Sequence, residues 1–162
     1  MNPFLFQNPG DLRDDELRLV LHETVPPAGN RAPTYRFQMR REYDAARLGR
    51  IELRLANTED ILLYVGHIGY SVESPHRGHH YAARSCRLLM DLGRSHGFHE
   101  LWITCDPDNV ASRRTCELAG AEFISIVAVP EEHPFFKAGS QAKCRFRLDL
   151  TGNGGLDKSS EK

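Results

Sequence analysis

Residues 77–82, RGHHYA, bring a fixed positive charge and a glycine to the expected start of a helix. The first N–H groups of a helix have no partner inside it, and together they carry about half a positive charge. Gly78 allows the backbone to turn and a ligand to come close, and Arg77 adds a full charge. These residues predict an anion site suited to a phosphate or pyrophosphate, with an ordinary strand-to-helix turn as the alternative.

The histidines of this turn suggest a second kind of site. His76, His79 and His80 form an HxxHH pattern, with His67 nearby in sequence, and zinc favours His and Cys ligands. Because His79 and His80 are adjacent, however, their side chains point to different sides of a helix start. No cysteine or carboxylate completes an obvious ligand set. We therefore expect no metal site, and a metal-binding α+β domain remains an alternative.

Hydropathy patterns predict the elements that would position the turn. Alternating or continuous apolar runs indicate strands at 16–25, 34–43, 47–56, 61–72, 101–105, 122–129 and 143–150. A 3.6-residue period predicts one helix over 82–97, and a second helix runs from Asp108 or Asn109 to Gly120. The first helix would bury one stripe, made of Ala82, Cys86, Leu89, Leu92 and Gly93. This order predicts an α+β fold, a mixed sheet with helices on its faces.

Length, charge and cysteine usage restrict the class of protein. The 162 residues suit a single domain, predicted over 1–150, followed by a Gly- and Ser-rich flexible tail over 151–162. The net charge of -1 argues against a general nucleic-acid surface. We find no signal-peptide pattern and no apolar run approaching the ~20 residues of a membrane span. Four cysteines without a CxxC pair indicate free thiols in a reducing cytoplasm. We therefore predict a cytoplasmic protein whose partner is neither nucleic acid nor membrane.

Two motifs carry a resemblance to a known family, while the P-loop and Rossmann patterns are missing. GHIGYSVESPHRGHHYAARSCRLL resembles the strand-4, turn and helix-3 region of the GNAT acetyltransferase superfamily. Its Gln/Arg-x-x-Gly-x-Gly/Ala turn holds the pyrophosphate of acetyl-CoA. Arg77 and Ala82 match the first and last positions, and His80 stands at the central glycine. LWITCDPDNVASRRTCELAGAEF looks like strand 5 and helix 4 of the family, so the resemblance covers roughly residues 61–124.

The resemblance implies a GNAT-like fold, acetyl-CoA as cosubstrate, and direct transfer of the acetyl group to a primary amine. It places Asn109 and Ser112 along the pantetheine arm. The cofactor-binding residues implied in total are Tyr70, Ser71, Val72, Arg77, Gly78, His79, His80, Tyr81, Ala82, Asn109 and Ser112. The alternative is an acyl-CoA-binding module of the same fold with little or no catalysis.

Direct transfer needs proton handling at both ends of the reaction. Many family members use a tyrosine on helix 4 to protonate the leaving thiolate, and Cys116 stands at the matching position. Family bases often come from strand 4, where His67 is the titratable residue and Glu73 a weaker candidate. Each has a structural alternative, because Cys116 would also pack well and His67 would also serve as a hydrogen-bonded core histidine.

The acceptor side departs from the family pattern. The family usually places two helices between its first two strands, whereas only VPPAGNRAPT separates 16–25 from 34–43. The acceptor pocket is therefore open, or is built by the 130–142 loop with Phe135 and Phe136, or by a partner subunit in a homodimer. The strands carry Arg36, Arg40, Arg41, Arg47, Arg50 and Arg54. These would suit an acidic acceptor if they line the open side, or would form a solvated sheet face, and the acceptor is a small-molecule or peptide amine.

Overall fold

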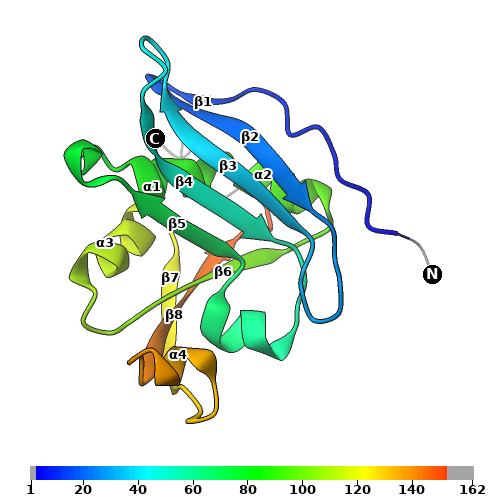
Figure 1. Ribbon diagram of the computed structural model, residues 1–162, viewed down its shortest axis with the longest axis vertical. Coiled ribbons are helices and arrows are strands. Elements are labelled where there is room, and N and C mark those ends of the chain that lie inside the picture. Colours follow the sequence, from blue (N-terminus) through cyan, green and yellow to red (C-terminus); the bar gives the residue numbers. More distant parts are fainter. Residues whose placement is uncertain (1–2, 153–162) are drawn as a thin grey trace.

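Two antiparallel sheets form the frame of the computed structural model, which describes residues 3–152 (Figure 1). The first sheet has the order β1-β2-β3-β4-β5, and its strands are Leu12–Asp14, Leu17–Val25, Thr34–Arg41, Arg47–Arg54 and Ile68–Val72. The second has the order β6-β8-β7, with β6 at Glu100–Cys105, β7 at Glu122–Ala128 and β8 at Ala142–Asp149. The helices are α1 (Tyr81–Leu88), α2 (Met90–Ser95), α3 (Val110–Leu118) and α4 (Pro134–Lys137), with short turns η1 (Ile61–Val65) and η2 (Ser74–His76). The α+β class predicted from the sequence is confirmed.

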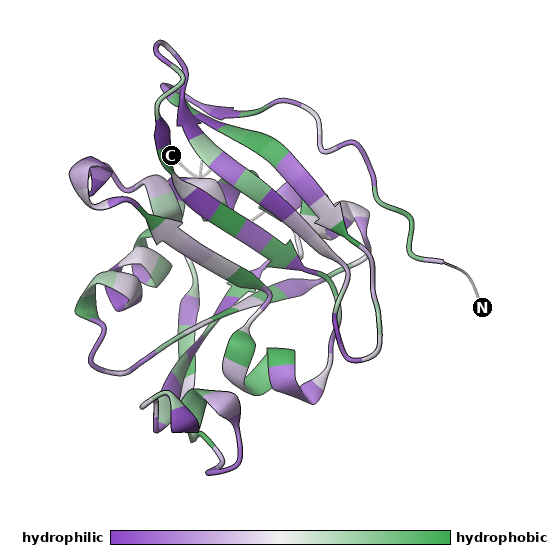
Figure 2. Ribbon diagram, in the orientation of Figure 1, coloured by the Kyte–Doolittle hydropathy of each residue, from purple (hydrophilic) through white to green (hydrophobic). Residues whose placement is uncertain are grey.

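The core lies between the first sheet and the helices α1 and α2 behind it (Figure 1). Along β3, Tyr35, Phe37 and Met39 are buried while Arg36 and Gln38 point to the opposite face. Figure 2 shows the same alternation as bands of hydrophobic and hydrophilic colour along the strands. The predicted helical stripe is also buried, from Ala82 through Gly93. One face of the sheet therefore carries the core, and the other carries polar side chains.

The strand predicted over 61–72 is wrong in its first half. Ile61–Val65 form a π-helical turn, η1, and only Ile68–Val72 form a strand. Gly66 ends the turn with φ of 80°, and a Cβ there would lie 2.9 Å from the carbonyl oxygen of Trp102. An apolar run of this length fits a buried helix as well as a strand, so periodicity did not separate the two.

The remaining predictions need smaller corrections. The helix predicted over 82–97 is interrupted at Leu89, which separates α1 from α2, and Gly97 follows α2 with positive φ as expected. β3 and β4 each end two residues before their predicted limits, at Arg41 and Arg54. The loop at 130–142 contains the short helix α4. From residue 153 onward, the predicted flexible tail lies outside the described residues.

The connection between β2 and β3 contains no helix, as the sequence predicted. Residues 26–33 form a tight turn closed by the pair Ala28 and Arg31, whose main chains exchange hydrogen bonds of 2.9 and 3.2 Å. This connection has no helix to cover the polar face of the sheet. No helix of the described chain is long and apolar enough to cross a membrane.

Candidate active site

A cavity of about 610 Å³ lies between β5, the turn that precedes α1, and α3. Ten of the eleven residues that the sequence assigned to cofactor binding line it: Tyr70, Ser71, Val72, Arg77, Gly78, His80, Tyr81, Ala82, Asn109 and Ser112. The exception is His79, whose ring lies beside that of Tyr81, with 5.3 Å between the ring centres. The fold therefore gathers two sequence motifs, about 30 residues apart, around one hollow.

The turn leaves several N–H groups directed toward the cavity. His80 precedes α1 in the left-handed conformation, with φ of 61° and ψ of 29°, and Gly78 has φ of 98°. The first helical hydrogen bond runs from the N–H of Arg84 to the carbonyl oxygen of His80, at 2.9 Å. Within residues 3–152, the N–H groups of Tyr81 and Ala82 therefore have no protein acceptor. Free N–H groups beside the exposed Arg77 can bind an anion.

Arg77 is held at the cavity by its own turn. Its Nε donates to the carbonyl oxygen of Val72 at 3.1 Å, and the short helix η2 sits between the two residues. This contact anchors the guanidinium through Nε and leaves its two terminal NH2 groups as further donors for a ligand. The predicted anion turn thus has the geometry that its sequence suggested.

β5 presents a free main-chain edge to the same cavity. The carbonyl oxygen of His67 accepts from the N–H of Arg54, and the N–H of Glu73 donates to Leu48. Because alternate residues pair with a given neighbour in an antiparallel ladder, Tyr70 and Val72 direct their main chains away from β4. β6 makes no ladder with β5 in the described chain. Strand N–H groups are therefore available for a carbonyl oxygen of a ligand in the gap.

The opposite wall comes from one side of α3. Asn109 caps this helix by accepting a hydrogen bond from the N–H of Ser112 at 3.0 Å, as the sequence predicted for Asn109 or Asp108. Ser112 shares the wall with residues that sequence reasoning did not assign, namely Ala111, Arg114, Thr115 and Leu118. Their spacing of three to four residues was the signal that could have found them. His76, at the end of η2, is the remaining unassigned lining residue.

The Tyr70 hydroxyl bridges the two walls. It shares a hydrogen bond of 2.6 Å with the Ser112 hydroxyl, across the gap between β5 and α3. Burial raises the pKa of Tyr70, so the phenol holds its proton at neutral pH. The sequence placed Tyr70 in the cofactor site but could not place its hydroxyl. The structure places this protonated hydroxyl at the cavity wall, beside Ser112.

Cys116 lies beneath the cavity wall and does not line it. Its side chain is fully buried, and interaction with the Cys105 thiol together with burial raises the pKa of Cys116. The same interaction lowers the pKa of Cys105 to about 7. All four cysteines are free and buried. Cys116 therefore keeps its proton, and it reaches the cavity only through its neighbours.

His67 lies outside the cavity, in the core between the sheets. Its Nδ1 accepts from the N–H of Trp102 at 2.8 Å, and its Nε2 lies 2.9 Å from the Asn57 side-chain oxygen. Burial lowers the pKa of His67 to about 4, so the ring is neutral and both nitrogens are engaged. These contacts match the structural alternative that the sequence left open for His67.

The structure also locates the loop that the sequence suggested for acceptor binding, and it bears on the possible metal site. Phe135 belongs to α4, where it lies under Lys143 with 4.6 Å between the ammonium and the ring centre. α4 is fixed to η1 by the pair His133 and Asp60 at 2.6 Å. Within the part of the chain that the structure describes, no three His, Cys, Asp or Glu side chains could hold a metal ion together.

The sequence was compared with known protein families once this geometry was in hand. Residues 5–122, well over half of the chain, match the sequence model described as Acetyltransferase (GNAT) domain. Among curated proteins, none matches the chain in sequence.

Solved structures share the fold at low sequence identity. Ribosomal-protein-S5-alanine acetyltransferase from Vibrio fischeri aligns with a TM-score of 0.57 and 14% identity, over 72% of this chain and 62% of that protein. A mutant of spermidine N-acetyltransferase from Vibrio cholerae aligns with a TM-score of 0.55 and 16% identity, over 72% and 64%. The microcin C7 self-immunity acetyltransferase, solved with acetyl-CoA and AMP, gives 0.56 and 14%, over 72% and 61%. The chain thus spans just under two thirds of these proteins.

Proposed function

The chain belongs to the GNAT acetyltransferase family, and on that premise we propose that it transfers an acetyl group from acetyl-CoA directly to a primary amine. The observation that carries the proposal is the single cavity lined by the β5 edge, the Arg77–Ala82 turn and α3. The anion turn, the free strand edge and the Tyr70 hydroxyl all lie around this cavity, which supports a ligand that carries phosphates, amides and a thioester.

The cosubstrate would lie along the gap between β5 and α3. Its pyrophosphate would accept hydrogen bonds from the free N–H groups at the start of α1, with Arg77 supplying a fixed charge. Its pantetheine amides would pair with the free edge of β5 and approach Asn109. The solved microcin immunity enzyme binds acetyl-CoA on the same fold, which supports this use of the gap.

The chemistry is nucleophilic substitution at the thioester. The amine nitrogen forms a bond to the carbonyl carbon, the carbon–sulfur bond breaks, and CoA leaves as a thiolate. Negative charge that builds on the carbonyl oxygen would be stabilised by a β5 N–H group, with Tyr70 and Val72 as the candidates. The amine loses one proton and the thiolate gains one, so the site needs an acceptor and a donor of protons.

We assign the proton donor to Tyr70, with Cys116 as the second candidate. The Tyr70 hydroxyl lines the cavity and is hydrogen-bonded to Ser112. Cys116 is fully buried behind this wall. The donor must reach the sulfur of CoA, and of the two candidates only Tyr70 lines the cavity.

His67 is the less favoured base. To accept a proton it would have to leave the N–H of Trp102, which occupies its lone pair in the core. Water at the open face of the sheet needs no such rearrangement, so we propose that the amine proton passes to solvent.

Two sequence predictions also stay proposals. Four buried free thiols fit a reducing compartment, which supports the cytoplasm as the location. A homodimer that completes the acceptor side remains a prediction from the sequence.

The proposal is tested by turnover of acetyl-CoA with a panel of small amines and peptides, measured as release of free CoA thiol. We expect amine-dependent release for at least one acceptor class, and one acetyl group added per thiol released. Tight acetyl-CoA binding without release for any acceptor would favour the alternative of a binding module.

Variants at Tyr70 and Cys116 show which of the two residues donates the proton. Tyr70→Phe removes the hydroxyl and keeps the ring, so it should lower kcat by about 10²–10⁴-fold while acetyl-CoA affinity changes little. Cys116→Ala should change kcat much less. The reverse ranking would transfer the donor role to Cys116.

A further inference from the structure

The outer face of the first sheet is open over β2, β3 and β4, because α1 and α2 lie behind the sheet (Figure 1). Two hollows, of about 480 and 210 Å³, lie on this face. Arg36 and Glu52 line both, so the hollows adjoin and form one shallow groove. β4 supplies one side of the groove from Arg47 to Arg54, and a strand of eight residues is roughly 25 Å long.

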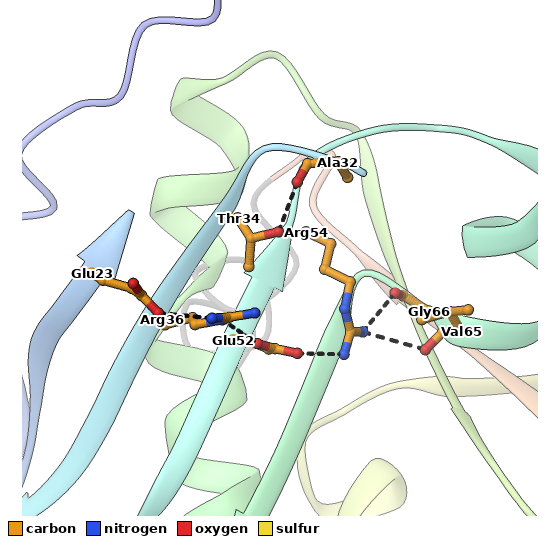
Figure 3. A network of polar contacts seen from close by, with 8 residues as sticks. All are labelled: Glu23, Ala32, Thr34, Arg36, Glu52, Arg54, Val65 and Gly66. Carbon is orange, nitrogen blue, oxygen red and sulfur yellow. Dashed lines mark hydrogen bonds and ion pairs between the residues drawn. The ribbon is translucent and has the colours of Figure 1, made fainter. Parts of the chain in front are cut away.

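A fixed polar network crosses the middle of the groove, as Figure 3 shows. Arg36 contacts Glu23 at 2.7 Å and Glu52 at 3.1 Å. Arg54 contacts the other oxygen of Glu52 at 2.7 Å and donates to the carbonyl oxygen of Gly66 at 3.0 Å. The Glu52 side chain is only 17% exposed. Its carboxylate is therefore held in place at the floor of the groove.

One end of the groove carries cations that the network does not use. Arg50 has neither an ion pair nor a side-chain hydrogen bond within residues 3–152, although it lines the larger hollow beside Arg47. Arg47 pairs with Glu73 at 3.2 Å, but both side chains are about half exposed, so this pair is weak. Over the whole groove, five arginines face three carboxylates. The groove therefore has surplus positive charge at its Arg47–Arg50 end.

The groove adjoins the cavity of the candidate active site. Arg50 lies directly opposite Ser71 of β5, and Glu52 lies opposite Gly69. Side chains of directly opposed residues stand about 5 Å apart on one face of a sheet. Ser71 also lines the cavity between β5 and α3. An acceptor in the groove would thus be one strand away from a thioester bound in the cavity.

We propose that the groove binds the acceptor as an extended polypeptide N-terminus, with an acidic residue at its third position. This inference rests on the proposed acetyltransferase function. The terminal amine lies at the Glu52 end, next to Gly69, and the acidic side chain of the third residue meets Arg50, beside Arg47. Arg50 and Glu52 are two residues apart on one strand face, about 7 Å, which is also the spacing of alternate residues in an extended peptide. The length and shallow, polar walls of the groove suit an extended chain.

The test uses three amidated tetrapeptides that differ only at the third residue: Ala-Ala-Glu-Ala, Ala-Ala-Gln-Ala and Ala-Ala-Lys-Ala. We expect kcat/KM for the glutamate peptide to exceed that for the glutamine peptide by about tenfold or more, the effect of one hydrogen bond between charged groups. Arg50→Gln should remove most of this preference and leave the acetyl-CoA Kd unchanged. Arg18→Gln is the matched control, because Arg18 is exposed on β2 of the same sheet and lines neither hollow.

Several results would overturn the inference. Equal kcat/KM for the three peptides would do so while leaving the acetyltransferase function intact. A weaker acetyl-CoA Kd in Arg50→Gln would show that the arginine serves the cosubstrate. If no peptide is acetylated, the inference is tested by calorimetry, which measures binding of the glutamate peptide in the presence of CoA. Binding that weakens about tenfold in Arg50→Gln supports the groove without the enzyme activity, and no binding of the peptide overturns it.

Discussion

His80 keeps the turn of the anion site in a conformation that glycine adopts more easily. It stands where the family motif has glycine, and its φ of 61° and ψ of 29° are left-handed. For a residue with a Cβ atom this conformation costs about 1–2 kcal/mol. The turn therefore carries local strain at His80, which a glycine at this position would avoid.

Replacing His80 by glycine should therefore stabilise the protein. Relief of the strain exceeds the added chain entropy of glycine by about 0.5–1 kcal/mol, which corresponds to a rise in Tm of roughly 1–4 °C. Acetyl-CoA affinity should stay the same or increase, because the N–H groups keep their directions. The measurement is thermal unfolding with calorimetric titration of acetyl-CoA.

The neighbouring histidine provides the control. His79 does not have positive φ, so His79→Gly should lower Tm through chain entropy alone. A lower Tm for His80→Gly would mean that the imidazole makes a stabilising contact that exceeds the strain.

Sequence reasoning predicted local structure best where the main chain requires a particular residue type. Gly78 and Asn109 were assigned because turns and helix caps require particular residue types at particular positions. It could not predict the role of His67, because the hydrogen-bond partners of its two ring nitrogens, Trp102 and Asn57, come from other parts of the chain. The Tyr70 and Ser112 contact was equally out of reach, since it joins two elements 42 residues apart.

At the scale of elements, α1 is tied to the β1–β2 turn by a charged cluster. Arg84 contacts Asp14 at 2.6 Å and Glu16 at 2.8 Å, and the Tyr81 hydroxyl donates to Glu16 at 2.9 Å. The Arg84 guanidinium is the main cause that lowers the pKa of Glu16 to about 2. Because α1 begins at the anion turn, this cluster positions the proposed cosubstrate site.

The cluster should make stability depend on pH in the acid range. Glu16 has a folded-state pKa below its unfolded value of about 4.5. Its contribution is therefore present above pH ~4.5 and is lost as the pH falls toward 2. Allowing for solvent screening of a partly exposed pair, we expect Glu16→Gln to lose about 1–2 kcal/mol at pH 6 and much less near pH 2.5.

Denaturant unfolding at the two pH values measures this difference. Glu131→Gln is the matched control, since Glu131 is an exposed loop residue, and it should change neither value. A constant loss for Glu16→Gln at both pH values would show that the carboxylate does not titrate as the cluster implies.

The elements themselves were predictable wherever one period dominated. In β3 and in α1, the spacing of apolar residues within the segment matches the side chains that are buried. The sequence of each segment was therefore enough to predict its type. η1 was not predictable, because tertiary contacts stabilise its carbonyl groups. Arg145 donates to Leu62, and the Thr104 hydroxyl donates to Tyr64. A helical turn held by residues 40 or more positions away leaves no local signal.

For the molecule as a whole, the site lies where the two sheets separate. The N–H of His67 donates to Trp102 at 2.7 Å and joins the sheets at one end of β5. Beyond that point β5 and β6 form no ladder in the described chain, and Tyr70 reaches α3 across the gap. A ligand in the gap would therefore contact both halves of the fold at once.

Acetyl-CoA should consequently stabilise the whole domain cooperatively. At 100 times its Kd, a ligand that binds only the folded state adds about 2.7 kcal/mol, and for a domain of this size that is a rise in Tm of roughly 5–10 °C. Gly78→Pro should lower the unliganded Tm and also lose most of this rise, because proline cannot adopt the φ of 98° and lacks the N–H. Zinc, tested in parallel, should give no rise. A rise with zinc and none with acetyl-CoA would show that the histidines of the turn, and not its N–H groups, form the binding site.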